Sequence, residues 1–403
     1  MKRFNKNILV FVFAALFIGF GVWGCLGGIK DEVFKLFSEL KQGNISGIIV
    51  FEENIDNISD KNLSYHNELM DINSVKENLI GTRIIVKDDS TVVKSDSGSL
   101  YSPAAELSDL DIEQVSSKIK DLKDIAEENG AKFLYCAAPV KANYMNTPAN
   151  VENFAKNNYG RFITALSQKV PYLDFAEVFE KNNISGDDIF FYTDHHWRPR
   201  SAFVAVKAVC EELNTRYGFE YNEEYTDIAN YTVENYENWF LGALGKKVGT
   251  FFTSRGADDF ELIAPVFDTS LTEEQPAKNL IRSGKFEDTV MYIDNIKKDF
   301  YAVNSYAAYS GGDFRLQIVR NNLNENGKKV LLIRDSFACA AAPFLALQTA
   351  ELHICDIRNF EYFVGDRLNI KEYIQEIKPD YVLVLYSGVK SIERANGGYD
   401  FID

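Results

Sequence analysis

Two short runs of the chain contain the residue types that serine-based acyl transfer requires. Residues 192–197 include Asp194 and His196, and residues 330–337 include Ser336. A serine hydroxyl is a weak nucleophile near neutral pH, so it needs a base within hydrogen-bond reach and a third group that orients this base. We therefore interpret Ser336 as the nucleophile, His196 as the base and Asp194 as the orienting carboxylate of a catalytic triad.

The first run also contains a second histidine. The whole sequence has only 4 histidines, and His195 and His196 are adjacent. In an extended chain the side chains of residues i and i+2 lie on the same face, so Asp194 can orient and polarise His196. His195 then lies on the opposite face, and we expect it to be structural or to face the substrate.

The second run predicts a strand that ends at the proposed nucleophile. Residues 330–333 are apolar, and the charged pair Arg334 and Asp335 follows them. Ser336 then falls on a strand-to-helix turn at the carboxyl edge of a sheet, where α/β proteins place their chemistry. The helix expected after this turn would direct its first backbone amides at a developing oxyanion, with the Ser336 N–H as the main donor.

These residues also allow other interpretations. Asp335 and Ser336 are typical of a helix N-cap after a strand. The run 192–197 is compatible with a polar turn before a helix that begins near Pro199. The carboxylate and the two imidazoles of this run are also zinc-ligand types. Because the chain has no HExxH spacing and no second histidine cluster, we predict no metal and no cofactor.

The length and the net charge limit the number of domains and the kinds of ligand that the protein can have. The chain has 403 residues, of which 46% are hydrophobic, so it can bury a large core in one large domain or two smaller ones. Acidic residues outnumber basic ones by 59 to 43, which gives a net charge of −16. This charge argues against nucleic acid as a ligand of the folded part.

The order of hydrophobic patterns predicts the fold class. From residue 109 onward, strand-like and helix-like segments alternate, which is typical of an α/β fold with a doubly wound, mostly parallel sheet. A segment at about 218–320 interrupts this alternation with short β-like pieces, including 289–293, and we interpret it as a β-rich insertion. We expect residues 30–108 to form a stalk with first β pieces at 47–51 and 83–86, and residues 109–403 to form the α/β domain.

The amino end predicts a membrane anchor. Lys2, Arg3 and Lys6 precede an uncharged apolar run at 8–29, which is long enough to span a bilayer with its basic side in the cytoplasm. We therefore expect residues 1–29 to form a transmembrane helix in the cytoplasmic membrane, with the remaining domain extracytoplasmic. A lipoprotein signal ending at Cys25 and a cleaved secretory signal remain open for the same segment.

Several motifs together resemble the bacterial DHHW family, named for its Asp-His-His-Trp run. These motifs are Tyr-Thr-Asp-His-His-Trp at 192–197, Asn-Ser-Tyr at 304–306, Gly-Gly-Asp at 311–313 and Asp-Ser-Phe at 335–337. Shorter similarities at 138–141, 244–252 and 380–386 extend the resemblance over roughly residues 110–390. That family is similar to the alginate O-acetyltransferase proteins, which have a permuted SGNH-hydrolase-like domain.

This resemblance implies a fold, a site and an activity. It implies an SGNH-hydrolase-like domain in which Asp194, His196 and Ser336 form the triad. It also implies a cell-envelope enzyme that O-acetylates or deacetylates an exported polysaccharide, partnered by a membrane-bound O-acyltransferase. Two features differ from the SGNH pattern: Arg334 stands where glycine is usual, and the usual Asp-x-x-His is absent because Trp197 stands three residues after Asp194, as in the alginate group. In addition, Ser387 stands where asparagine is expected at the end of the last strand.

Other residues are candidates for the edge of the substrate pocket. We expect Lys141, Gly312 and His195 to contribute to substrate binding or to an oxyanion site. The competing hypothesis is a non-catalytic envelope adaptor, which keeps the fold and binds a glycan or a membrane-bound O-acyltransferase. Transfer to a sugar hydroxyl and hydrolysis by water both fit the sequence, because they differ only in how the site positions the acceptor and excludes water.

Overall fold

The computed structural model describes residues 66–87, 90–388 and 398–401. The predicted anchor at 8–29 and the predicted β piece at 47–51 lie outside these residues. Among the helices of the described ranges, none combines the length and the apolar character that crossing a bilayer requires. The chain divides into two compact units after Lys76, and α4 (His66–Leu79) runs across this division. All of the architecture below belongs to the second unit, Glu77–Asp403.

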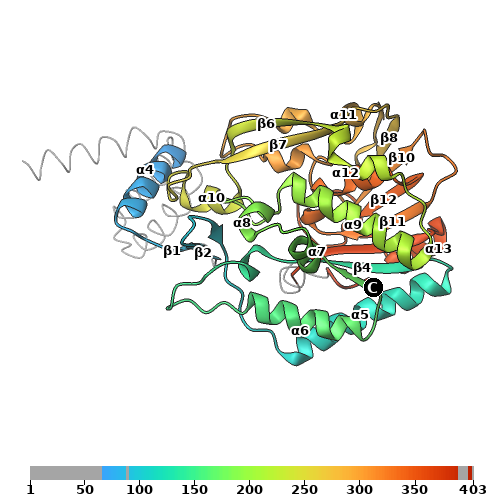
Figure 1. Ribbon diagram of the computed structural model, residues 1–403, viewed down its shortest axis with the longest axis horizontal. Coiled ribbons are helices and arrows are strands. Elements are labelled where there is room, and N and C mark those ends of the chain that lie inside the picture. Colours follow the sequence, from blue (N-terminus) through green and yellow to red (C-terminus); the bar gives the residue numbers. More distant parts are fainter. Residues whose placement is uncertain (1–65, 88–89, 389–397, 402–403) are drawn as a thin grey trace, which may run out of the picture. The chain divides into compact units, whose positions relative to one another are not determined.

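An 8-stranded mixed sheet forms the centre of this unit, in the order β5-β4-β13-β11-β12-β10-β8-β9 (Figure 1). The first five strands of this order are mutually parallel, and the last three are antiparallel to their neighbours. The parallel strands are β4 (Lys132–Ala138), β5 (Tyr172–Asp174), β11 (Lys329–Arg334), β12 (Glu351–Cys355) and β13 (Tyr381–Ser387). The antiparallel strands are β8 (Leu271–Gln275), β9 (Leu280–Gly284) and β10 (Leu316–Asn321).

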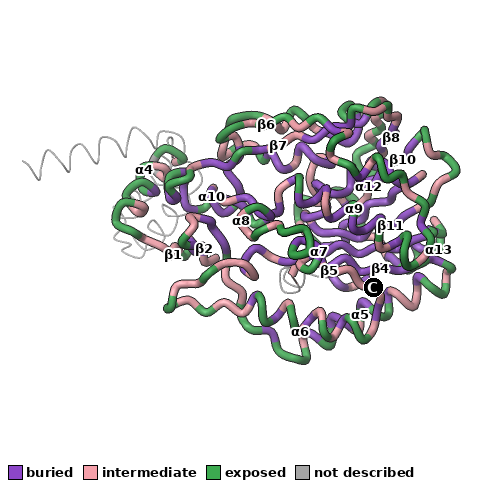
Figure 2. Tube along the Cα trace, in the orientation of Figure 1, coloured by how far each residue is buried: buried purple, intermediate pink, exposed green. Residues whose placement is uncertain are grey.

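Helices cover both faces of the sheet, which confirms the predicted α/β class. Alternate residues of β4 enter two different cores: Leu134 and Cys136 enter one, and Phe133 and Tyr135 enter the other. This alternation follows from the period of 2 along a strand. Figure 2 shows the central strands buried and the outer sides of the helices exposed. The helices are α7 (Phe175–Lys181), α9 (Pro199–Tyr217) and α12 (Ala342–Ala346) in the first core, and α5 (Asp109–Glu128), α6 (Ala155–Ser167) and α13 (Ile370–Ile377) in the second.

The segment at 218–320 is only partly separate from the main sheet. Its strands β6 (Tyr231–Phe240) and β7 (Asp258–Pro265) form a two-stranded sheet. The strands β10, β8 and β9 instead extend the main sheet, since β10 pairs with β12, β8 with β10, and β9 with β8. The strand predicted at 289–293 was wrong. Residues Phe286–Thr289 form the short helix α11, and Met291 makes only an isolated bridge to Tyr309. A short apolar run has the same pattern in a buried turn as in a strand.

The described residues between 77 and 108, which precede α5, are part of the second unit. The predicted β piece at 83–86 is present as β1 (Ile84–Lys87), which pairs with β2 (Ser90–Lys94), and β2 pairs with β3 (Leu100–Tyr101). Val92 and Leu100 pack with Leu244 of α10 (Ala243–Val248) in a small separate core. The part of the predicted stalk at 77–108 is therefore a component of the compact unit, and it reaches the candidate site.

Replacing a core leucine of the central strand should be costly. Leu332 of β11 is 1% exposed, and Leu332→Ala should lower the free energy of unfolding by about 2–5 kcal/mol because it leaves a cavity between the helical layers. Leu323→Ala removes the same atoms from a side chain that is 61% exposed and should change it by less than about 0.5 kcal/mol. Urea unfolding followed by circular dichroism measures both. Equal effects would contradict the central position of β11.

Candidate active site

The two runs that define the candidate chemistry meet at the carboxyl edge of the sheet. His196 Nε2 lies 2.8 Å from Ser336 Oγ, and His196 Nδ1 lies 2.7 Å from Asp194 Oδ1. Both distances are within the range of strong hydrogen bonds. A serine hydroxyl, an imidazole and a carboxylate therefore form one continuous hydrogen-bonded chain, which is the arrangement that general-base activation of a serine requires.

Buried charges hold the loop that contains Asp194 and His196. The carboxylate of Asp258 accepts hydrogen bonds from the backbone amides of Tyr192 and Thr193. From the other side, Lys141 Nζ donates to the carbonyl oxygens of Phe191, Tyr192 and Asp194, at 2.6 to 3.0 Å. The loop is thus fixed through both its donors and its acceptors.

Lys141, which was expected at the edge of the pocket, has this loop as its main contact. The residue is buried, and it is one of the residues that line the cavity described below. Burial lowers the pKa of Lys141 to about 7, and the carboxylates of Asp258 and Asp194 oppose this shift. Its three carbonyl acceptors match the three N–H donors of an ammonium group. A substrate-binding role for Lys141 stays a prediction.

The environment of Asp194 keeps it ionised. Its Oδ1 accepts from the His196 backbone amide at 2.8 Å, and its Oδ2 accepts from the Ala243 amide at the start of α10. Burial alone would raise the pKa of Asp194, but the charges of His195 and His196 and the two hydrogen bonds from His196 together lower it. Residue 242 must be glycine, because a Cβ there would lie 2.3 Å from the Asp194 Cβ. A stably charged carboxylate favours the Nδ1–H tautomer of His196, which leaves Nε2 to accept the Ser336 proton.

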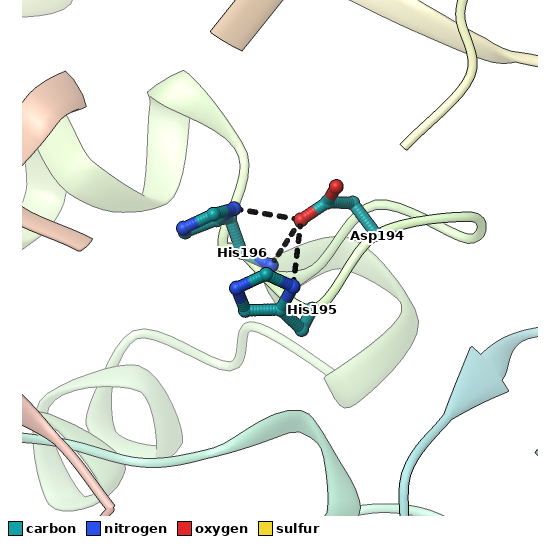
Figure 3. A group of neighbouring side chains, drawn as sticks. All are labelled: Asp194, His195 and His196. Carbon is teal, nitrogen blue, oxygen red and sulfur yellow. Dashed lines mark hydrogen bonds and ion pairs between the residues drawn. The ribbon is translucent and has the colours of Figure 1, made fainter. Parts of the chain in front are cut away.

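His195 does not lie on the face opposite to His196, so this prediction was wrong. Its Nδ1 lies 3.4 Å from Asp194 Oδ1, and its ring centroid is 3.9 Å from that of His196 (Figure 3). The run bends at these residues rather than extending, so the period of 2 does not apply. The His195 side chain is 48% exposed and borders the cavity next to Ser336, so a substrate-facing role remains open.

Asp335 connects the ends of two neighbouring parallel strands. One carboxylate oxygen accepts from the Phe337 amide at 2.9 Å, and the other accepts from the amide and hydroxyl of Ser387 at 2.8 and 2.6 Å. Asp335 is thus the N-cap of the turn after β11, in agreement with one of the alternative interpretations. The helix expected after Ser336 is a short 3₁₀ turn, η7 (Ser336–Ala340), followed by α12.

Two aromatic residues, to which the sequence analysis assigned no role, hold this turn against the histidine loop. Trp197 Nε1 and the Tyr306 hydroxyl both donate to the Phe337 carbonyl oxygen, at 2.8 and 3.1 Å. The Tyr306 ring also stacks on His196, with centroids 4.3 Å apart and planes 16° apart. Both residues belong to motifs recognised in the sequence, but only the fold shows that they share one acceptor.

Gly312 is not a residue of the pocket. Its carbonyl oxygen accepts from Arg334 Nη2 at 2.7 Å, and the residue does not border the cavity beside Ser336. The buried Arg334 also pairs with Asp313 of the same turn. Gly312 therefore helps to hold the guanidinium that replaces the usual SGNH glycine, and the expected oxyanion or substrate role of Gly312 has no support in the geometry.

A cavity of about 390 Å³ opens beside Ser336. Its wall is largely apolar and comes from eight separate segments of the chain, including residues ahead of α5. This volume falls in the range of small-molecule sites in proteins. Around Ser336, the wall includes Tyr101, Pro103, Leu107, Val140, His195, Leu244, Lys247, Phe337 and Arg358.

The run that contains Asp194 and the two histidines also forms the one group of possible metal ligands among the described residues. Atoms of Asp194, His195 and His196 lie within 4.8 Å of one another. However, His196 directs Nδ1 at Asp194 and Nε2 at Ser336, so a metal on either nitrogen would have to break one of these hydrogen bonds. The geometry favours a proton-transfer chain over a metal centre.

Comparison with known proteins agrees with the fold. Residues 98–238 match the family model described as the SGNH hydrolase-like domain of the acetyltransferase AlgX. Bacillus cereus PatB1 with a sulfonyl adduct superimposes with a TM-score of 0.63 at 22% identity, covering 79% of this chain and 100% of that one. A DHHW family protein from Eubacterium siraeum gives a TM-score of 0.57 at 21% identity, covering 79% and 97%. No curated protein sequence matches this chain.

The matched structures show that the chain has an SGNH hydrolase-like α/β fold, and residues 98–238 are similar to the corresponding domain of AlgX. The resemblance to the DHHW proteins that the motifs indicated is therefore confirmed. At these identities the matched structures establish the fold, whereas the roles of the individual residues depend on the geometry of this chain.

Asp194→Asn should flatten the acid dependence of stability. The folded-state pKa of Asp194 is lowered, so its contribution to stability is present above its ordinary pKa and is lost as the pH falls toward the folded value. Below about pH 4, the free energy of unfolding of the wild type should therefore fall more steeply than that of the variant, by up to about 1.4 kcal/mol per pH unit. Urea unfolding at a series of acidic pH values gives both slopes. Parallel slopes would show that Asp194 has no such shift.

Proposed function

We propose that this protein is a cell-envelope serine acyl-transfer enzyme that acetylates, or deacetylates, an exported polysaccharide. The observation that carries the proposal is the hydrogen-bonded chain of Ser336, His196 and Asp194 at the wall of a mostly apolar cavity. The acetyltransferase description of the matching family model supports the acyl group and the reaction class.

In the first half-reaction, Ser336 Oγ attacks the acyl carbon while His196 Nε2 takes the hydroxyl proton. The tetrahedral intermediate collapses when the bond from the acyl carbon to the donor oxygen breaks, and His196 returns the proton to that leaving oxygen. Asp194 holds the imidazole through Nδ1 and stabilises its protonated form at 2.7 Å. The product is an ester of Ser336.

In the second half-reaction, a hydroxyl group of the acceptor attacks this ester. His196 takes the acceptor proton, the bond between Ser336 Oγ and the acyl carbon breaks, and the proton passes back to Ser336. A sugar hydroxyl as acceptor gives transfer, and water gives hydrolysis. Apolar walls from Leu107, Val140 and Leu244 exclude water from part of the cavity, which favours transfer.

The location proposed from the sequence completes the function. The apolar run at 8–29, preceded by Lys2, Arg3 and Lys6, anchors the chain in the cytoplasmic membrane with the catalytic unit outside. An exported glycan would reach the site there, and a membrane-bound O-acyltransferase would supply the acyl group across the bilayer. The net charge of −16 disfavours nucleic acid as a partner, because a polyanion is repelled by an acidic protein.

A serine-directed fluorophosphonate probe tests the chemistry. The full-length wild type should be labelled at one site, and Ser336→Ala should abolish the labelling because the reactive oxygen is lost. Ser283→Ala is the matched control, since this serine lies on β9 and contacts only Thr272 among the described side chains. Failure to label the wild type would instead favour the non-catalytic adaptor, in which the same cavity binds a ligand without turnover.

Cell fractionation tests the location. The full-length chain should sediment with cytoplasmic membranes and be digested by protease added outside the membrane, because residues 8–29 can span it. Cys25→Ala should leave this behaviour unchanged if the segment is an uncleaved helix, and should block lipid attachment if it is a lipoprotein signal. Recovery of the wild type in the cytoplasm would contradict the proposed location.

A further inference from the structure

Arg358 lies beside Ser336 because of the register of two parallel strands. In the pairing of β11 with β12, Ile333 is opposite Cys355, so Ser336 and Arg358 each lie three residues beyond the last paired position. Both residues border the same cavity. The side chain of Arg358 is only 8% exposed. A guanidinium so deeply buried beside a nucleophile calls for a specific role.

Several donors on the cavity wall with Ser336 already have acceptors. The Phe337 amide and both the amide and the hydroxyl of Ser387 donate to Asp335. On the cavity wall, Lys141 donates to three carbonyl oxygens, and the Asn158 amide group donates to the Ala105 carbonyl oxygen. The donors of Phe337, Ser387 and Lys141 cannot also serve an oxyanion without breaking contacts that hold the site, whereas Asn158 has a second N–H.

Arg358 retains a donor. Its Nε donates to Asp356 at 2.9 Å, and its Nη2 lies 2.5 Å from Asp356 and 3.3 Å from Asp313. Its Nη1 has no hydrogen-bond partner among the described residues. Nη1 is also not one of the fully buried polar atoms that lack a hydrogen-bond partner. Nη1 is therefore not fully enclosed, and Arg358 borders the cavity.

We propose that Arg358 is a further catalytic residue, whose Nη1 donates a hydrogen bond to the carbonyl oxygen of the acyl group at Ser336. The proposal rests on the acyl-transfer function proposed above. With the Ser336 amide predicted as the first donor, Nη1 supplies the second donor of an oxyanion site. No bond is made or broken at Arg358, which stays protonated throughout.

The charges around the site explain why a guanidinium suits this position. Negative charge develops on the acyl oxygen close to the carboxylate of Asp335, which is buried. A cationic donor offsets that repulsion more effectively than a neutral amide does. Asp356 and Asp313 orient the guanidinium, and the Phe360 ring lies 4.8 Å from its centre, so the donor is fixed before the reaction begins.

The test uses the full-length chain with p-nitrophenyl acetate as substrate. Arg358→Ala and Arg358→Lys should each lower kcat by about 10²–10³-fold with little change in KM, because the donor acts on the transition state. Added guanidinium ion should restore part of kcat in Arg358→Ala and none in Ser336→Ala. Arg282→Lys is the matched control, since Arg282 pairs with Glu273 away from the cavity, and it should keep wild-type kcat.

Two outcomes would overturn the assignment. Wild-type kcat in Arg358→Ala would do so, and so would a lower kcat that guanidinium does not rescue and that accompanies a lower melting temperature. If the variants do not fold, a crystal structure of the wild type sulfonylated at Ser336 decides the matter, with Arg358 Nη1 expected within hydrogen-bond distance of a sulfonyl oxygen. A wild type that neither turns over nor reacts at Ser336 refutes the proposed function itself, which is a different result.

Discussion

The carbonyl oxygen of Phe337 joins the two parts of the chain that form the site. It accepts from Trp197, which directly follows His196, and from Tyr306, whose ring stacks on His196. Without these bonds, the distance from His196 to Ser336 would depend on two loops that move independently. The shared acceptor and the stacked ring hold the imidazole in place more firmly than a single hydrogen bond between side chains would, because several contacts must break before the imidazole can move.

The site is also surrounded by buried charges that are arranged in compensating sets. Lys141 and Asp258 hold the loop of Asp194, while Arg334 and Arg358 pair with Asp313 and Asp356 behind the nucleophile. Such groups are costly to bury, and they are tolerated where each has partners. Their value here is orientation rather than stability, since they hold backbone carbonyls, amides and one guanidinium in fixed positions around a cavity.

The hydrophobic periods in the sequence predicted much of the scaffold. The strand β11, the turn at Ser336 and the alternation of strands and helices from residue 109 onward were expected from local patterns. The strand expected at 289–293 was not found, and β8 to β10 joined the main sheet instead of a separate insertion. Short apolar runs do not specify a partner strand, because pairing depends on which edge of the sheet is free once the parallel strands are in place.

The sequence by itself determined the residue types of the site, the α/β class and the likeness to the DHHW proteins, because these depend on local order and spacing. Only the tertiary structure decided which of these side chains border the cavity and which of them hold neighbouring residues in place. It turned His195 to the same side as His196, removed Gly312 from the pocket and placed Arg358 beside Ser336. These outcomes depend on a bend in one loop and on the register of neighbouring strands, and both are set by contacts between residues that are distant in the chain.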